Sequence, residues 1–221
     1  MREEKTLDQY LTEEQQVELL KRLWKEYGLA VLTGVALAVM IVFGWRFYQT
    51  YRVEQRQQAS MIYEHMMISL INHQYDEADN QAKILRSHFR DTPYSTIAAL
   101  TTAKIAVDRG NTVMAIRMLR WASAHGQGNA FRQTARIRLA RVYLDQKKPN
   151  QALNILESID DAAFMPLVDE TKGDAYVQLG SILQAQTAYN RALAALPDTA
   201  LNRPLVEMKL ADLPVEDNQK N

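Results

Sequence analysis

The pattern of apolar and polar positions divides the 221-residue chain into one long apolar run and a helical remainder. Nineteen consecutive positions, 27–45, carry no charge. With the helical rise of 1.5 Å per residue the run is about 28 Å long, close to the hydrocarbon thickness of a bilayer. Beyond residue 52 the apolar residues recur at helical spacing, with hardly any strand signal. The pattern predicts an all-α chain with one transmembrane helix near its N-terminus.

Aromatic and basic residues at both ends support a transmembrane helix, which we place at 27–48. Tyr27 and Trp45 are typical of membrane interfaces, and Lys25 and Arg46 flank the run. A buried helix of a globular core and a cleaved signal peptide are the alternatives. The polar stretch before the run is long and acidic, and no small-x-small cleavage pattern follows it, which favours an uncleaved anchor. Basic residues are equally frequent on the two sides, so charge leaves the orientation open.

Small residues recur every four positions within the span, at Ala30, Gly34 and Ala38. This spacing forms a stripe on one helix face that lets another transmembrane helix approach closely. Small residues are also common in membrane helices that have no such partner. The stripe therefore has two interpretations: a packing face for another transmembrane helix, or the ordinary composition of a membrane helix.

Helix-breaking residues divide the rest of the chain into pairs of helix-length segments. An alanine follows the turn inside each predicted pair, where the second helix must pack closely on the first. These residues are Ala78, Ala115, Ala152 and Ala185. Their separations of 37, 37 and 33 residues fit two-helix repeats about 34 residues long. The spacing predicts an α-solenoid of about four degenerate helical hairpins.

The last repeat resembles the tetratricopeptide signature at seven positions in register. They are Gly173, Tyr176, Gly180, Ala185, Tyr189, Ala192 and Pro197. In this register Gly173 and Ala192 are small contacts between helices, and Tyr176 and Tyr189 fill the space around them. The signal fades toward the membrane. We expect a tail at 1–26, the transmembrane helix, a tetratricopeptide-like domain at 49–200 and a C-terminal segment at 201–221.

The tetratricopeptide register implies a groove lined by the first helix of each hairpin. It places there Ile97, Leu100, Lys104, Val107, Ile137, Arg141, Leu144, Leu167, Glu170 and Val177, with Asp108, Asp145 and Asp174 beside them. Apolar side chains interleaved with charges of both signs suit an amphipathic or extended polypeptide better than a small polar metabolite. The alternative for several of the apolar residues is a place in the core between neighbouring repeats.

Charge is distributed unevenly although the net charge is zero. Residues 83–148 carry 13 Lys and Arg against 3 Asp and Glu, whereas 149–221 carry 5 against 11. The basic segment RQTARIRLAR at 132–141 is compatible with a nucleic-acid or anionic-lipid partner. Its interleaved apolar residues favour an amphipathic repeat helix whose charge is neutralised in part by acidic residues in 149–178. We expect no nucleic-acid partner.

No residue pattern indicates catalysis or a cofactor. The chain has no cysteine, and its four histidines are dispersed. The acidic pairs Asp76-Glu77 and Asp160-Asp161 lie at turns, where acidic residues cap helix N-termini. Phosphate loops, dinucleotide fingerprints and nucleophile elbows do not occur. We expect a protein without enzyme activity, metal or cofactor.

The order of elements and three segments resemble the YfgM family, the ancillary subunits of the bacterial SecYEG translocon. The segments are RLARVYLDQKKPNQALNILESI at 138–159, ETKGDAYVQLG at 170–180 and EMKLADL at 207–213. The resemblance implies a single-pass protein of the bacterial inner membrane, with a cytoplasmic N-terminus and a periplasmic repeat domain. It also implies the SecYEG translocon and the membrane-anchored periplasmic chaperone PpiD as partners.

Two functions from different classes fit these features. The first is a non-enzymatic translocon subunit that binds unfolded secreted proteins as they emerge and passes them to the periplasmic chaperones. The second is a static membrane-anchored scaffold or regulator that binds one folded partner through its repeats or its tail. Binding of several unrelated unfolded proteins favours the first function, and a single stoichiometric partner favours the second.

Overall fold

The computed structural model describes residues 13–214, and every regular element in this range is a helix. The elements are α1 (Glu13–Ile71), α2 (Tyr75–His88), α3 (Pro93–Asp108), α4 (Thr112–His125), α5 (Asn129–Asp145), α6 (Pro149–Leu156), a short 3₁₀ helix η1 (Ala162–Phe164), α7 (Met165–Gln178), α8 (Ile182–Ala195) and α9 (Arg203–Ala211). The predicted all-α class is confirmed. The chain divides into two compact units, and the boundary lies inside α1 between Glu54 and Gln55.

The first unit contains the apolar run, which is part of the uninterrupted helix α1. This helix is long and apolar enough to cross a membrane. All side chains from Leu29 to Thr50 are exposed, among them Ala30, Gly34 and Ala38. Such exposure disagrees with a buried helix of a globular core. The packing face at the three small residues stays a prediction.

Part of the predicted N-terminal tail at 1–26 also belongs to α1, because the helix begins at Glu13. The first twelve residues of that tail lie outside the described residues. The same holds for positions 215–221 of the predicted C-terminal segment. Within that segment, α9 is a regular helix.

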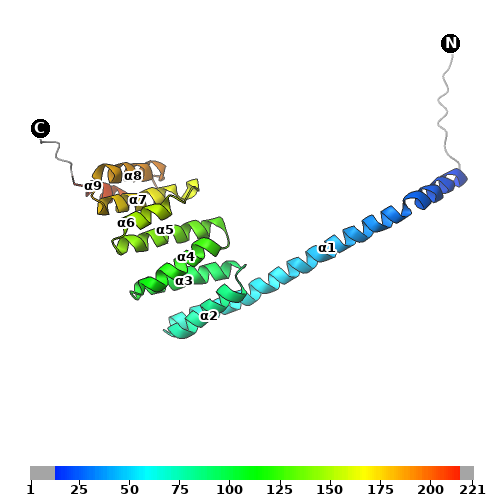
Figure 1. Cartoon of the computed structure of the whole chain (residues 1–221), viewed down its shortest axis with the longest axis horizontal. Coiled ribbons are helices and arrows are strands. Elements are labelled where there is room, and N and C mark those ends of the chain that lie inside the picture. The colour runs from blue at the N-terminus through cyan, green and yellow to red at the C-terminus, as the bar shows by residue number, and fades with distance from the viewer. Residues whose placement is uncertain (1–12, 215–221) are drawn as a thin grey trace, which may run out of the picture. The chain divides into compact units, whose positions relative to one another are not determined.

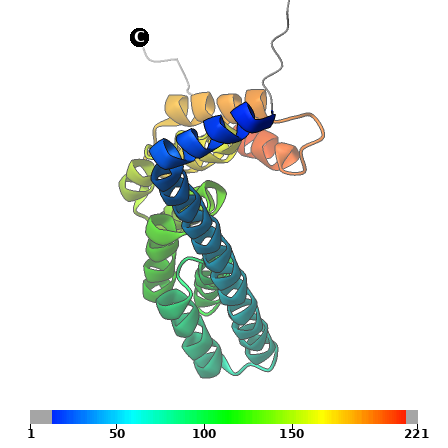
Figure 2. The ribbon, with the colours of Figure 1, turned by 90° about the vertical axis from the view of Figure 1, so that its right-hand side faces the viewer.

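The second unit is a stack of helical hairpins (Figure 1). The last turns of α1 pack on α2, α3 pairs with α4, α5 with α6, and α7 with α8, after which α9 packs on α8. The hairpins follow one another in chain order, and α2 and α9 lie at opposite ends of the stack in both views (Figure 2). The predicted α-solenoid of about four hairpins is confirmed.

The same backbone turn closes all four hairpins. One residue in each turn has a left-handed backbone: His73 (φ 59°), Gly110 (φ 72°), Lys147 (φ 58°) and Gly180 (φ 73°). The N–H of the next residue donates to the carbonyl five residues back: Gln74 to Ser69 (2.8 Å), Asn111 to Ala106 (2.7 Å), Lys148 to Tyr143 (2.9 Å) and Ser181 to Tyr176 (2.9 Å). These bonds satisfy carbonyls at the end of the first helix, as in a Schellman motif.

The predicted alanines lie five residues after the left-handed residue in every hairpin. Ala78 is 4% exposed, and Ala115, Ala152 and Ala185 are fully buried. Each lies in the first turn of the second helix of its hairpin, beside the first helix. The repeat register read from the alanine spacing is therefore confirmed in all four hairpins.

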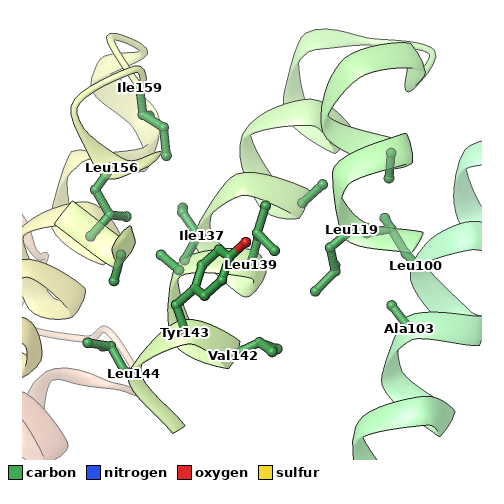
Figure 3. Close-up of a cluster of buried hydrophobic side chains, with 14 of the residues drawn as sticks. Leu100, Ala103, Leu119, Ile137, Leu139, Val142, Tyr143, Leu144, Leu156 and Ile159 are labelled. Atoms are coloured by element: carbon green, nitrogen blue, oxygen red, sulfur yellow. The ribbon is translucent and has the colours of Figure 1, made fainter. Parts of the chain in front are cut away.

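A continuous apolar core joins the middle hairpins (Figure 3). Leu100 and Ala103 from α3 and Leu119 from α4 pack on one side of α5, and Leu156 and Ile159 lie on its other side. Ile137, Leu139, Val142, Tyr143 and Leu144 are the labelled α5 residues between them. Since α5 is covered on both sides, nearly half of its residues are buried. Smaller clusters hold the two ends of the stack.

Gly173 and Tyr189 meet at a close crossing between α7 and α8. A Cβ atom on Gly173 would lie 2.5 Å from Tyr189 Cδ1 and 2.8 Å from its Cζ. Tyr189 is only 2% exposed, and its hydroxyl donates a hydrogen bond of 2.8 Å to Asp174 Oδ1. The ring therefore has little freedom to move away. The predicted role of Gly173 as a small contact beside Tyr189 is confirmed.

We expect Gly173→Ala to destabilise the protein by roughly 1–3 kcal/mol, because the added methyl group overpacks the Tyr189 ring. In an uncrowded helix the same substitution would stabilise the protein, because alanine is favoured over glycine by about 1 kcal/mol. The sign of the stability change therefore distinguishes a crowded from an uncrowded site. Thermal unfolding followed by circular dichroism measures the change. The exposed α8 substitution Gln186→Ala is the control and should change stability by less than about 0.5 kcal/mol. A stabilised Gly173→Ala protein would contradict the crossing.

Gly180→Ala should cost about 1 kcal/mol, because it forces a Cβ atom into the left-handed conformation. Lys147 occupies the equivalent turn position and already carries a Cβ. The matched substitution Lys147→Ala should therefore be close to neutral. Chemical denaturation of the two variants beside the wild type makes the comparison, and equal losses of stability would refute the backbone explanation.

Candidate functional site

The larger of two neighbouring pockets in the second unit lies between α5, α7 and α9 and has a volume of about 1040 Å³. Arg141 and Leu144 of α5, Leu167 and Glu170 of α7, and Lys209 of α9 line it. The loop between α8 and α9 adds Leu196 and Pro197, and the segment before α7 adds Ala162 and Ala163. This pocket presents apolar side chains beside an ionic cluster.

The smaller pocket lies between α3 and α5 and has a volume of about 330 Å³. Leu100, Ala103, Leu119 and Val142 provide apolar walls. The charged residues that line it are Lys104, Asp108, Arg138, Arg141 and Asp145. Arg141 and Asp145 also line the larger pocket, so the two are neighbours. We refer to the two pockets together as the groove.

Seven of the ten residues predicted for the groove line one of its pockets. Leu100, Lys104 and Val107 line the smaller pocket, Leu144, Leu167 and Glu170 the larger one, and Arg141 both. Ile97, Ile137 and Val177 line neither pocket. Ile137 is 3% exposed and belongs to the core. Val177 is 40% exposed, beside the turn that ends α7.

A partly buried ionic cluster forms one wall of the larger pocket. Lys209 Nζ donates to Glu170 Oε1 (2.8 Å) and to Asp174 Oδ2 (2.9 Å). Asp174 also accepts the Tyr189 hydroxyl, and Arg141 lies 3.8 Å from Glu170 Oε2. Glu170 is 4% exposed, so its charge is tolerated only because cations compensate it. The cluster thus joins α5, α7, α8 and α9.

The pKa values of two members of this cluster reflect their surroundings. Burial lowers the pKa of Lys209, but hydrogen bonds to Glu170 and Asp174 and their charges outweigh burial, so the pKa lies above its ordinary value. Burial, followed by the hydrogen bond to Asp174, raises the pKa of Tyr189 well above its ordinary value. Lys209 is therefore charged and Tyr189 is a hydrogen-bond donor at neutral pH.

The arginines of α5 differ in their hydrogen-bond and ion-pair partners. Arg132 donates to the Gly126 carbonyl (3.0 Å), and Arg136 donates to the Ser158 carbonyl (3.0 Å). These two side chains support neighbouring loops of the solenoid. Arg141 makes the one ion pair of this segment with residues 149–178, across to Glu170. The basic segment is thus part of a repeat helix, as expected, but that helix is covered on both sides rather than amphipathic. Among the described residues, neutralisation of the segment by 149–178 is limited to this one ion pair.

The sequence prediction missed the contribution of α9 to the groove. Lys209, Leu205 and Asn202 line the larger pocket. Val206 is fully buried against α8, with Leu210 and Leu213 packed beside it. The spacing of these three apolar residues is the signal that a further helix packs on the last hairpin.

Within residues 13–214 no group of three His, Asp or Glu side chains is arranged to hold a metal ion. Asp161, one of the paired acidic residues at turns, accepts from the Ala163 N–H (3.1 Å) and caps η1. This contact is the capping role expected for it.

A hairpin solenoid with an open groove and, among the described residues, one helix long enough to span a membrane define an α-helical repeat protein with a candidate membrane anchor. The chain belongs to the tetratricopeptide repeat-like domain family, whose model matches residues 21–215. This match covers the apolar run as well as the hairpins. Repeat domains of this type act as scaffolds.

Three curated relatives resemble the chain over almost its whole length, and each is named an ancillary SecYEG translocon subunit. The protein of Escherichia coli K12 is 26% identical over 206 residues, 93% of this chain and 98% of its own. The proteins of Neisseria gonorrhoeae and Haemophilus influenzae are 28% and 27% identical, each over 92% of this chain and 98% of their own. The resemblance read from 138–159, 170–180 and 207–213 is confirmed.

We expect Lys209→Met to destabilise the protein by roughly 1–3 kcal/mol, because it leaves the buried Glu170 without its closest cation. The double variant Glu170→Gln/Lys209→Met should be less destabilised than the sum of the two single variants. Chemical denaturation at neutral pH measures all three. Additive losses would show that the pair does not interact.

The contribution of Lys209 should also depend on pH in a defined direction. Its pKa is higher in the folded than in the unfolded state, so its stabilising effect is fully present below the ordinary lysine pKa of about 10.4. That effect disappears as pH rises through the folded-state value. The difference in stability between wild type and Lys209→Met should therefore be constant from pH 7 to 9 and shrink only above about pH 10.4.

Proposed function

We propose that the chain is a non-enzymatic ancillary subunit of a SecYEG translocon, anchored in the inner membrane by the span in α1. Its groove binds secreted proteins that emerge unfolded, and it passes them to the periplasmic chaperones, among them PpiD. The N-terminus is cytoplasmic and the repeat domain is periplasmic in this proposal. The protein acts by binding without turnover.

The extent of the similarity carries the proposal. Each of the three relatives is covered over 98% of its length, so the candidate span and all the hairpins fall within the matched region. An ancillary translocon subunit needs an anchor beside the channel and a surface for another polypeptide. The chain has an exposed apolar helix and a groove to supply them.

The groove supports binding of an unfolded chain rather than of a small metabolite. Its two pockets have apolar walls that include Leu100, Leu144 and Leu167, and they lie on successive first helices of the solenoid. An extended polypeptide can place side chains in both pockets at once. Charged residues between the apolar walls suit the mixed polarity of unfolded sequences.

Site-specific photocrosslinking in living cells tests this function. A photoreactive residue in place of Val107 or Leu167, which line the smaller and the larger pocket, should capture nascent secreted chains of several different sequences. The same residue at Asn154 or Gln186, exposed positions on α6 and α8 that line neither pocket, is the control and should capture far less. Capture of SecYEG and PpiD subunits from any position supports the proposed assembly.

Capture of one folded protein in fixed ratio, with no nascent chains, would replace the proposal by a static scaffold or regulator. A reporter fused to the C-terminus tests the orientation separately. Activity of a reporter that works only in the cytoplasm would overturn the periplasmic location of the repeat domain.

A further inference from the structure

The charged residues of the groove are not all neutralised by one another. Lys104 Nζ lies 2.7 Å from Asp108 Oδ2, and Lys209 is held by two carboxylates in the larger pocket. These contacts compensate two of the four cations of the groove within the protein. The two that remain are Arg138 and Arg141, one turn apart on α5.

Within the described part of the chain, neither guanidinium is hydrogen-bonded to a carboxylate. Among residues 13–214, Arg138 has no carboxylate oxygen within 4 Å, and Arg141 reaches only Glu170, at 3.8 Å. Glu170 has a closer cation in Lys209, whose Nζ lies 2.8 Å from Oε1. The Arg141 side chain is 45% exposed, so its donors are open to a ligand. An arginine presents paired donors that match a carboxylate.

The two arginines lie at an apolar cavity. Leu100, Ala103, Leu119 and Val142, each at most 6% exposed, form the walls of the smaller pocket. Its volume of about 330 Å³ is at the lower end of the range for ligand sites. A cavity of this size and polarity accepts an aliphatic side chain, while the guanidinium groups remain at the charged part of its lining.

Asp145 limits the kind of anion that fits. It lies one turn after Arg141 on α5 and lines the same pocket. With Lys104 and Asp108 compensating each other, Arg138, Arg141 and Asp145 leave this pocket with a single net positive charge. One carboxylate matches that charge, whereas a nucleic acid or another polyanion would meet repulsion from Asp145.

We propose that the smaller pocket selects client segments in which an aliphatic residue stands next to an aspartate or glutamate. The aliphatic side chain enters the cavity, and the neighbouring carboxylate accepts hydrogen bonds from Arg138 and Arg141. This inference rests on the proposed polypeptide-binding function of the groove and adds a sequence preference to it. The two arginines are specificity residues, and the apolar walls supply affinity for clients in general.

Fluorescence anisotropy with the full-length protein in neutral detergent micelles tests the preference. The probes are short Gly- and Ser-rich peptides with a Leu-Glu-Leu centre, a neutral dye, and both termini blocked. Matched probes carry Gln or Lys in place of Glu, and empty micelles correct for partitioning. We expect the Glu probe to bind about tenfold more tightly than the Gln probe, and this preference to fall at high salt.

The double variant Arg138→Gln/Arg141→Gln should bind the Glu and Gln probes equally, with the affinity that the wild type has for the Gln probe. Arg117→Gln removes an exposed arginine of α4 that lines neither pocket and should keep the tenfold preference. Thermal unfolding verifies that each variant is folded. Should the double variant not fold, the wild-type series of Glu, Gln and Lys probes still decides.

Equal wild-type affinity for the Glu, Gln and Lys probes would overturn the preference and leave general polypeptide binding in place. A preference that survives in the double variant would overturn the assignment to Arg138 and Arg141. Binding of none of the probes would overturn the proposed polypeptide-binding groove itself, and the preference with it.

Discussion

Close crossing of two helices is the constraint on which the second unit depends. A side chain larger than alanine at the buried crossings would push the helix axes apart. Four alanines at equivalent positions, and Gly173 against the Tyr189 ring, meet this requirement. The turn before each alanine fixes the direction in which the second helix starts. Regular stacking of the hairpins follows from repeating this one arrangement four times.

The groove is a consequence of that stacking. Successive first helices face the same side, so α3, α5 and α7 contribute neighbouring walls. The ionic cluster around Glu170 then fixes α9 against α7 and completes the larger pocket. Lys209 is held there by two carboxylates of the protein, which leaves Arg138 and Arg141, the two arginines that line the smaller pocket, as the cations of the groove with donors open to a ligand.

Periodicity and the spacing of small residues were enough to predict the helical class, the candidate span, the hairpins and their register. Each depends on local chemistry: the length of an apolar run, a small side chain at a crossing, or a turn beside it. Seven predicted groove residues line the two pockets because they share the register of the first helices.

The sequence could not show which apolar residues of α5 are covered on both sides, and so Ile137 was predicted for the groove although it lies in the core. Nor could a register limited to repeats include α9, since its Lys209 reaches Glu170 across 39 positions of the chain. Ion pairs over such separations follow from packing and leave no local pattern. Whether Arg138 and Arg141 find a carboxylate partner depends on the same long-range packing.

The position of α9 also determines the order in which the two pockets can be completed as the chain is made. Every residue of the smaller pocket precedes Gln146, so it is present once α3, α4 and α5 have been synthesised and can pack together. The larger pocket waits for Lys209, near the C-terminus. A growing chain therefore contains every residue of the smaller pocket well before it contains Lys209, which the larger pocket needs.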